Sequence, residues 1–177
     1  MGINIEKDDV VLVAGLLAPS AAAMEGLIRE LEKLWGPVGH KSDLLDFDFT
    51  DYYAREIGPD LKRQFIAFGT PVRPETLRES KIASNDLEAR LSVEGRRRVN
   101  VDPGYLDLSK LVVASTKDAT YRVYLGEGVY AQSMLWYEKG SYRPWPWTYA
   151  DYRTEVAISF FNKVRMDYKG ELESGNR

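Results

Sequence analysis

The sequence predicts an α+β fold, with a ferredoxin-like β-α-β-β-α-β core that is extended by an antiparallel β-meander and a C-terminal helix. Three observations predict it. Val10–Leu17 is a short, continuous apolar run, which is typical of a buried strand. Three other stretches carry apolar residues at helical spacing, and alternation with period two dominates the chain after Tyr105. Up to residue 101 the predicted elements follow the split β-α-β order.

The predicted core begins with the strand at Val10 and a well-delimited helix. Ser20 is placed to cap the start of this helix, and Gly36-Pro37 is placed to end it. The second strand has a polar and an apolar face, because Leu45, Phe47 and Phe49 alternate with Asp46, Asp48 and Thr50. The other core elements are a short helix at 51–57, a strand at 61–68, an exposed helix at 74–91 and a fourth strand at 97–101.

A type II turn is predicted to separate the core from the meander, because Asp102-Pro103-Gly104-Tyr105 combines a proline and a glycine at the favoured positions. The meander strands are expected at 111–115, 121–125, 129–137 and 142–145. Thr148 and Asp151 have weak capping spacing, and a last helix follows from Tyr152. We expect one domain over residues 1–169 and a disordered polar tail at 170–177.

Composition excludes several classes of site and partner. The chain has 177 residues and a net charge of −3, whereas a general nucleic-acid binder usually has a basic surplus. It has no cysteine and a single histidine, His40, which excludes disulfides, thiolate nucleophiles and metal sites built on several histidines. No apolar run is long enough to span a membrane, and the acidic start is unlike a signal peptide. We therefore expect a cytoplasmic protein.

Two glycine-rich patterns are typical of nucleotide-binding proteins, and the sequence matches only one of them as a string. Gly126-Glu127-Gly128-Val129-Tyr130-Ala131 fits the dinucleotide fingerprint as a string, but it lies between two predicted strands instead of opening a helix. A hairpin loop is the favoured interpretation. The phosphate-binding pattern Gly-x-x-x-x-Gly-Lys-Ser/Thr is absent from the sequence.

Acidic side chains on the second predicted strand suggest a metal site. Asp46 and Asp48 share one face of this strand, and Asp51 follows closely. Carboxylates about 7 Å apart could hold Mg²⁺ through bound waters. The alternative is a solvated strand face without function, because such a strand needs only one apolar face. Magnesium is accordingly a hypothesis for the cofactor.

Polar residues on the fourth predicted strand suggest a ligand site. Arg98, Asn100 and Asp102 fall on one face, and arginine binds phosphate or carboxylate at two points. Lys117 and Arg122 would add charge to this site, and Tyr105, Tyr124 and Trp147 would add stacking surfaces. The alternative is an internal lattice of ion pairs. We favour a ligand-facing Asp102, so that Asp102→Asn would leave stability nearly unchanged, or raise it, while binding changes.

Several long strings make the chain resemble a prokaryotic family known as domain of unknown function 4416. They are Phe47–Tyr53, Arg97–Tyr105, Leu111–Ala114 with Thr116-Lys117-Asp118, Arg122–Leu125, Pro146–Tyr149 and Asp151–Arg153. The family has no established reaction, and some of its members are labelled GTP-binding proteins. The chain departs from the family pattern at Tyr121, where a histidine is usual, and at Ala150, where a proline is usual. If that histidine is a catalytic base in relatives, this chain lacks it.

Two functions remain open from the sequence. The first is a site for a small anionic ligand, such as a nucleotide or a phosphorylated metabolite. The second is a non-enzymatic interaction module, either a homodimer or a surface for protein or RNA. A concave arrangement of Arg98, Asn100, Asp102, Arg122 and Tyr124 would favour the ligand site, and a flat arrangement would favour the module. Whether the protein is an enzyme stays undecided.

Overall fold

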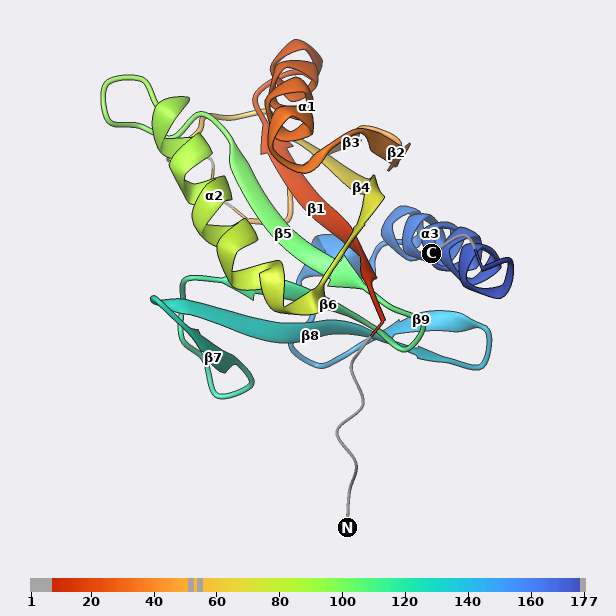
Figure 1. Ribbon diagram of the computed structural model, residues 1–177. Coiled ribbons are helices and arrows are strands. Elements are labelled where there is room, and N and C mark those ends of the chain that lie inside the picture. The colour runs from red at the N-terminus through yellow and green to blue at the C-terminus, as the bar shows by residue number, and fades with distance from the viewer. Residues whose placement is uncertain (1–7, 51–52, 54–55, 176–177) are drawn as a thin grey trace.

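A computed structural model describes residues 8–50, 53 and 56–175 (Figure 1). In chain order its elements are β1 (Val10–Ala18), α1 (Ala21–Trp35), β2 (Val38–Lys41), β3 (Leu45–Asp46), β4 (Lys62–Val72), the 3₁₀ helix η1 (Pro74–Thr76), α2 (Leu77–Arg90), β5 (Asn100–Leu106), β6 (Lys110–Ser115), β7 (Val123–Gly126), β8 (Val129–Glu138), β9 (Ser141–Pro144), the 3₁₀ helix η2 (Ala150–Arg153) and α3 (Glu155–Glu173).

The described strands form one antiparallel sheet of nine strands, in the order β2-β4-β1-β5-β6-β8-β7. In addition, β3 pairs with β4, and β9 pairs with β8. The first strand lies between β4 and β5, so both of its edges are paired. The predicted α+β class, with a large antiparallel sheet and a C-terminal helix, is confirmed.

Helices cover both faces of this sheet, which explains the continuous apolar run in β1. Leu12 and Leu16 pack with residues of α1 and α2, whereas Val11 and Val13 pack with α3 on the other face. Figure 1 shows α1 and α2 on one side of the sheet and α3 on the other. A strand that is buried on both faces has no polar side, so its sequence does not alternate.

Helix α1 forms as its sequence predicts. Ser20 Oγ accepts a hydrogen bond from the backbone N–H of Ala23 at 3.2 Å, which is the expected N-terminal cap. Gly36 ends the helix with a φ of +87°, and its N–H donates to Glu32 O. Helix α2 also forms, but it is less exposed than predicted, because Lys81, Ser84 and Glu88 are buried along with its apolar residues.

The predicted second strand is wrong in its extent. Regular pairing covers only Leu45–Asp46, although Phe47 N still donates to Leu61 O at 2.8 Å. Sequence analysis missed β2, whose Val-Gly-His-Lys stretch is half-buried at the sheet edge and lacks an apolar pattern. Most of the predicted helix at 51–57 lies outside the described residues.

The predicted type II turn at Asp102–Tyr105 is also wrong, because these residues lie inside β5. Pro103 pairs with Ala14 of β1, and pairing with β6 begins only at Gly104, opposite Val113. Gly104 has no positive φ, but a Cβ there would lie 2.4 Å from Val112 O. The glycine is therefore required for a close approach between two strands, and not for a turn.

The strand order of the predicted meander is wrong as well. β6 pairs with β8, while β7 and β9 share the other edge of β8. The loop 116–122 carries the chain from one edge of β8 to the other. The predicted hairpin loop at Gly126-Glu127-Gly128 is confirmed, because all three residues have positive φ and connect β7 to β8.

The cap of the C-terminal helix differs from the prediction. Thr154 caps α3, since its Oγ1 accepts from Ala157 N at 3.2 Å. Thr148 instead connects the preceding loop to β8, because its Oγ1 accepts a hydrogen bond from Trp145 N and donates one to Met134 O. Helix α3 continues through Gly170 to Glu173, into the stretch expected to be a disordered tail. No helix among the described residues has the length and apolar character needed to cross a membrane.

Candidate functional site

Two adjoining hollows lie where β5 and β6 separate. The ladder between these strands covers only Gly104–Leu106 and Leu111–Val113. Beyond it lies a hollow of about 180 Å³, here called the polar hollow, lined by Tyr53, Lys81, Asn85, Arg97, Asn100, Asp102, Ser115, Thr116, Lys117 and Tyr149. A second hollow of about 320 Å³, here called the aromatic hollow, is lined by Phe47, Phe49, Thr50, Tyr53, Arg63, Lys117, Arg122, Tyr149, Ala150 and Asp151. Because Tyr53, Lys117 and Tyr149 line both, the hollows form one candidate site.

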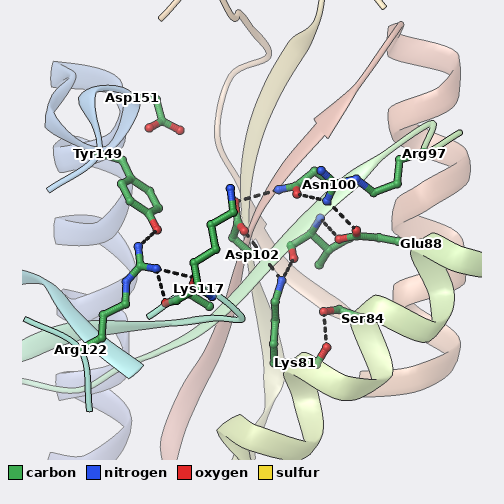
Figure 2. Close-up of polar contacts among 12 residues, drawn as sticks. Lys81, Ser84, Glu88, Arg97, Asn100, Asp102, Lys117, Arg122, Tyr149 and Asp151 are labelled. Carbon is green, nitrogen blue, oxygen red and sulfur yellow. Dashed lines mark hydrogen bonds and ion pairs between the residues drawn. The ribbon is translucent and has the colours of Figure 1, made fainter. Parts of the chain in front are cut away.

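Asp102 occupies the centre of this site (Figure 2). Its Oδ2 accepts a hydrogen bond from Asn100 Nδ2 at 2.9 Å and lies 3.8 Å from Arg63 Nη1. Its Oδ1 lies 3.9 Å from Lys81 Nζ. Figure 2 also shows the Lys117 side chain extending toward Asp102 from the loop after β6. One carboxylate therefore faces cations from three different elements.

Lys81 comes from the buried side of α2. Its Nζ donates to Val101 O at 2.9 Å, which places the ammonium group beside the β5 backbone. The neighbouring Glu88 accepts from Val101 N at 2.7 Å and from Arg97 Nη1 at 3.2 Å. Burial raises the pKa of Glu88, although the charge of Lys81 acts in the opposite direction. These contacts fix α2 to β5 and explain why polar residues of this helix are buried.

Arg63 is the most buried charged residue of the site, with 2% of its side chain exposed. It lies among aromatic rings, and its Cζ is 5.4 Å from the ring centroids of both Phe47 and Phe65. Its Nη2 forms an ion pair with Asp151, while Nε and Nη1 have no hydrogen-bond partner among the described residues. Burial, the largest single influence, works to lower the pKa of Arg63, but Asp151, Tyr152, Asp102 and Tyr53 together outweigh it, so the pKa is raised.

Gly15 of β1 makes room for this buried arginine. A Cβ at position 15 would lie 2.4 Å from the Tyr152 hydroxyl and 3.1 Å from Arg63 Nη1. The absence of a side chain thus lets Tyr152 and Arg63 pack directly on the sheet.

Arg122 holds Tyr149 at the boundary between the hollows. Its Nη2 donates to the Tyr149 hydroxyl at 2.7 Å, and its Nη1 donates to Ser115 Oγ and Lys117 O at 2.8 and 2.6 Å. Its Nε donates to Gln132 Oε1 at 2.6 Å. Burial, assisted by the charge of Asp102, raises the pKa of Tyr149 to about 12. The tyrosine hydroxyl is therefore neutral at physiological pH and is oriented by a fully engaged arginine.

Positive charge predominates in the site. Its lining includes five cationic side chains, Arg63, Lys81, Arg97, Lys117 and Arg122. Two carboxylates, Asp102 and Asp151, line it as well. Arg97 is offset by ion pairs with Glu56 and Glu88, which do not line the hollows. The other four cationic side chains still outnumber the two carboxylates, although the whole chain has a net charge of −3. Concave surfaces of one charge sign concentrate oppositely charged ligands.

The structure brings together half of the predicted ligand residues. Asn100, Asp102, Lys117 and Arg122 line the site. Arg98, Tyr105, Tyr124 and Trp147 do not. Arg98 is exposed outside both hollows, and Tyr105 lines a separate hollow beside the start of α2. Tyr124 is 59% exposed on the edge strand β7. Trp147 lies between Tyr121 and Trp145 in a nearly parallel stack, at centroid distances of 5.4 and 5.2 Å.

Asp46 and Asp48, the described members of the predicted metal site, do not lie in a cluster of metal-binding side chains. Asp46 forms an ion pair with Lys62, and its side chain is 83% exposed. Asp48 is exposed, and Asp51 lies outside the described residues. No group of three or more acidic or histidine side chains suited to a metal ion occurs in the described part of the chain. The magnesium hypothesis stays a prediction.

Sequence analysis missed three central residues, Arg63, Lys81 and Tyr149. Arg63 occupies an inward-facing position in a strand whose other inward residues are mostly apolar. A charged residue at such a position is unusual, and it could have indicated a functional residue. Lys81 belongs to a helix that was predicted to be exposed. Tyr149 lies in the string Pro146–Tyr149, which was used only for the family resemblance. The chemistry available in the site rests on amine, guanidinium, carboxylate and phenol groups, because His40 pairs with Asp167 of α3 elsewhere.

Comparison with known proteins identifies a family without an assigned activity. The family model described as "domain of unknown function (DUF4416)" matches residues 8–168, which is most of the chain. No curated protein matches the chain. No solved structure matches it either. The match supports the predicted resemblance, while the GTP-binding label of some relatives and a prokaryotic origin find no support in it.

Proposed function

The chain belongs to the family described as domain of unknown function 4416, and because that description assigns no activity, we propose from the geometry that the protein binds a small anionic ligand. The ligand is a nucleotide or another phosphorylated metabolite, held between β5, β6, α2 and the loop at Tyr149. Arg63, Lys81 and Lys117 supply positive charge, while Asn100 and Tyr149 supply hydrogen-bonding groups.

The observation that carries this proposal is the incomplete pairing of Arg63. A buried guanidinium group normally has partners for its N–H groups, because an unsatisfied buried donor costs about 1–3 kcal/mol and a charged donor more. Arg63 Nε and Nη1 have none in the described part of the chain, and Asp102 is 3.8 Å away. Arg63 lines the aromatic hollow, so a ligand there would bring acceptor atoms close to this incompletely hydrogen-bonded guanidinium group.

The concavity of the site favours this function over a flat interaction surface. Three of the five residues named as discriminators, Asn100, Asp102 and Arg122, line the hollows. The other two, Arg98 and Tyr124, are exposed outside them. A homodimer or a protein surface remains the second candidate, favoured by the edge strand β7, where Val123 and Tyr124 are 67% and 59% exposed.

The strand order supports the ferredoxin-like core, which we retain as a proposal. The strands β2, β4, β1 and β5 are neighbours in this order, and each neighbouring pair is antiparallel. With α1 and α2 as the connecting helices, this arrangement fits the ferredoxin-like β-α-β-β-α-β pattern. The remaining strands extend that sheet from β5.

Thermal denaturation with a panel of anions tests the proposed function. Inorganic phosphate, sugar phosphates, nucleotides and organic acids are added to the protein at millimolar concentration. At 100 times its Kd a ligand that binds only the folded state adds about 2.7 kcal/mol to the free energy of unfolding. We expect phosphorylated compounds to raise the melting temperature of the wild type by several degrees.

The control separates the site from general charge effects. Lys117→Gln removes one exposed ammonium group from both hollows, and Lys33→Gln removes an exposed ammonium group from α1. We expect the first variant to weaken the stabilisation and the second to leave it unchanged. Equal responses in both variants, or no stabilisation of the wild type by any compound, would contradict the proposal.

A further inference from the structure

We infer that the ligand carries a planar aromatic ring as well as its anionic group, with the ring in the aromatic hollow and the anionic group in the polar hollow. This inference rests on the proposed anion site and deepens it. It divides one ligand between two chemically different compartments. It therefore names the class of ligand, a phosphate or carboxylate attached to an aromatic ring, rather than a simple anion.

The aromatic hollow has the composition of a ring-binding compartment. Phe47, Phe49, Tyr53 and Tyr149 all line it. Phe47 contacts Phe49 and Tyr53 edge-on, at centroid distances of 5.6 and 6.0 Å, so the rings form one aromatic wall. Phe49 is 41% exposed, and the exposed part of its ring contributes no hydrophobic free energy to folding. A planar ligand ring would cover this exposed surface, because aromatic rings stack on one another favourably.

Arg63 gives this hollow a second reason to accept a planar ring. Its guanidinium plane already lies among aromatic rings, at 5.4 Å from Phe47 and 5.7 Å from Tyr152. Guanidinium groups pack against π-systems, so Arg63 adds to the surface on which a planar ring can stack. The hollow of about 320 Å³ is at the lower end of the range for small-molecule sites.

The polar hollow has the composition of an anion compartment and lacks apolar walls. Apart from the two shared tyrosines, its lining consists of side chains that are charged or carry amide or hydroxyl groups. Lys81 Nζ has one backbone acceptor at 2.9 Å and no carboxylate within hydrogen-bond distance, since Asp102 is 3.9 Å away. A phosphate or carboxylate in this hollow would meet the ammonium groups of Lys81 and Lys117.

The shared residues make the two compartments neighbours. Tyr53, Lys117 and Tyr149 line both, so a ligand that passes between these side chains would reach both hollows. Tyr149 is held there by its hydrogen bond from Arg122. A compound with its ring and its anionic group joined by a short linker matches this arrangement. A compound with only one of the two parts can fill only one hollow.

Isothermal titration calorimetry with dissected probes tests the inference. Adenosine 5′-phosphate and uridine 5′-phosphate carry both parts, ribose 5-phosphate carries the anion only, and adenosine carries the ring only. An aromatic carboxylate, indole-3-acetate, distinguishes a carboxylate from a phosphate as the anionic group. We expect at least one of the compounds with both parts to bind about tenfold or more tightly than ribose 5-phosphate. A tenfold difference in affinity corresponds to the contribution of about one stacking contact.

Two variants assign each part to its hollow. Phe49→Ala removes a partly exposed ring and should reduce the affinity for the two-part compound to that for ribose 5-phosphate, while leaving ribose 5-phosphate unchanged. Lys81→Met should weaken both compounds. Phe49→Leu keeps an apolar side chain of similar reach and controls for simple loss of contact area. Circular dichroism confirms that each variant is folded before titration.

The outcomes are distinct. Equal affinity for ribose 5-phosphate and the two-part compounds would overturn the assignment of a ring while leaving the anion site intact. Tighter binding of the two-part compounds that persists in Phe49→Ala would overturn the placement of the ring. Absence of binding by every phosphorylated probe and by indole-3-acetate would overturn the proposed anion site itself, and the inference with it.

Discussion

Asp102 has structural contacts in this site, and under the proposed function it also faces the ligand. Its carboxylate accepts from Asn100 and lies within 4 Å of Arg63 and Lys81. These distances are too long for direct hydrogen bonds, so Asp102 acts on the two cations mainly through its charge. With 13% of its side chain exposed, it also borders the polar hollow. The alternatives that the sequence left open are therefore compatible with each other.

This double role changes the expected effect of Asp102→Asn. The amide keeps the size of the side chain and can still accept from Asn100, but Arg63 and Lys81 lose a compensating charge. We expect a loss of about 1–2 kcal/mol in the free energy of unfolding, which is less than for breaking a direct buried ion pair. The expected sign is opposite to the stability change inferred from the sequence.

The same substitution should raise the affinity for anions. Five cationic side chains would then face one lining carboxylate instead of two. Calorimetric titration of phosphate compounds into Asp102→Asn and wild type measures this change, and Asp46→Asn on exposed β3 serves as the control. Weaker or unchanged anion binding in Asp102→Asn would show that the carboxylate contacts the ligand or lies outside the site.

At the scale of elements, the separation of β5 from β6 creates the polar hollow. Proline cannot donate a backbone hydrogen bond, and Pro103 precedes the residue at which the β5–β6 ladder ends. Gly104 then allows β5 to approach Val112 O closely. The Asp-Pro-Gly sequence thus marks a strand that leaves its neighbour, and not a chain reversal.

Gly104→Ala tests this account of the strand pair. An added methyl group would lie 2.4 Å from Val112 O, which is a backbone atom that cannot rotate away. Overpacking of this kind costs about 1–3 kcal/mol. Chemical denaturation should show this loss of stability for Gly104→Ala. Gly140→Ala provides a comparison, because a Cβ there meets no atom within 4 Å and only the positive φ of that residue opposes the change. Wild-type stability in Gly104→Ala would contradict the close approach.

Local signals made several elements predictable from the sequence. Helix α1 has a serine cap and a C-terminal glycine, and the β7–β8 hairpin has two glycines in its loop. Residues close together in sequence determine such features. The strand order β6-β8-β7 is different, because it depends on where the loop 116–122 crosses β8, and no local pattern encodes that crossing.

The candidate site was only partly predictable for the same reason. Asn100 and Asp102 share a strand face, so alternation alone placed them together. Lys81 approaches Asp102 from α2, and Arg63 approaches it from β4, two strands away in the sheet. These contacts arise only when the sheet is assembled. Tyr124 was predicted to add a stacking surface to the site, but it is exposed on the edge strand β7, as is its neighbour Val123.

At the scale of the whole molecule, burial keeps four tyrosines in their neutral form. Burial raises the pKa of Tyr53, Tyr142, Tyr149 and Tyr152, with nearby carboxylates acting in the same direction. Three of these residues, Tyr53, Tyr149 and Tyr152, are in or beside the candidate site, and Tyr142 packs in the core against α3. Their ionisation is therefore linked to unfolding of the domain.

This linkage predicts a loss of stability at alkaline pH. A tyrosine whose pKa is raised in the folded state binds its proton more tightly there than in the unfolded chain. Its stabilising contribution is complete below the ordinary pKa of 10 and disappears as the pH rises through the folded value, which is about 12 for Tyr149. The contribution is about 1.4 kcal/mol for each unit of pKa difference, and this is an upper limit for Tyr149 because it retains some contact with solvent.

Chemical denaturation at a series of pH values, followed together with the ultraviolet absorbance of tyrosinate, measures this effect. We expect the four buried tyrosines to ionise only as the protein unfolds. Tyr149→Phe should lower stability at neutral pH by about 1 kcal/mol, because Arg122 loses a hydrogen bond. Between pH 10 and 12 this variant should lose less stability than the wild type, since one linked proton is absent. Parallel pH profiles for the two proteins would show that Tyr149 ionises as easily in the folded protein as in the unfolded chain. The Tyr149 hydroxyl would then be exposed to solvent where the two hollows adjoin, and not buried there.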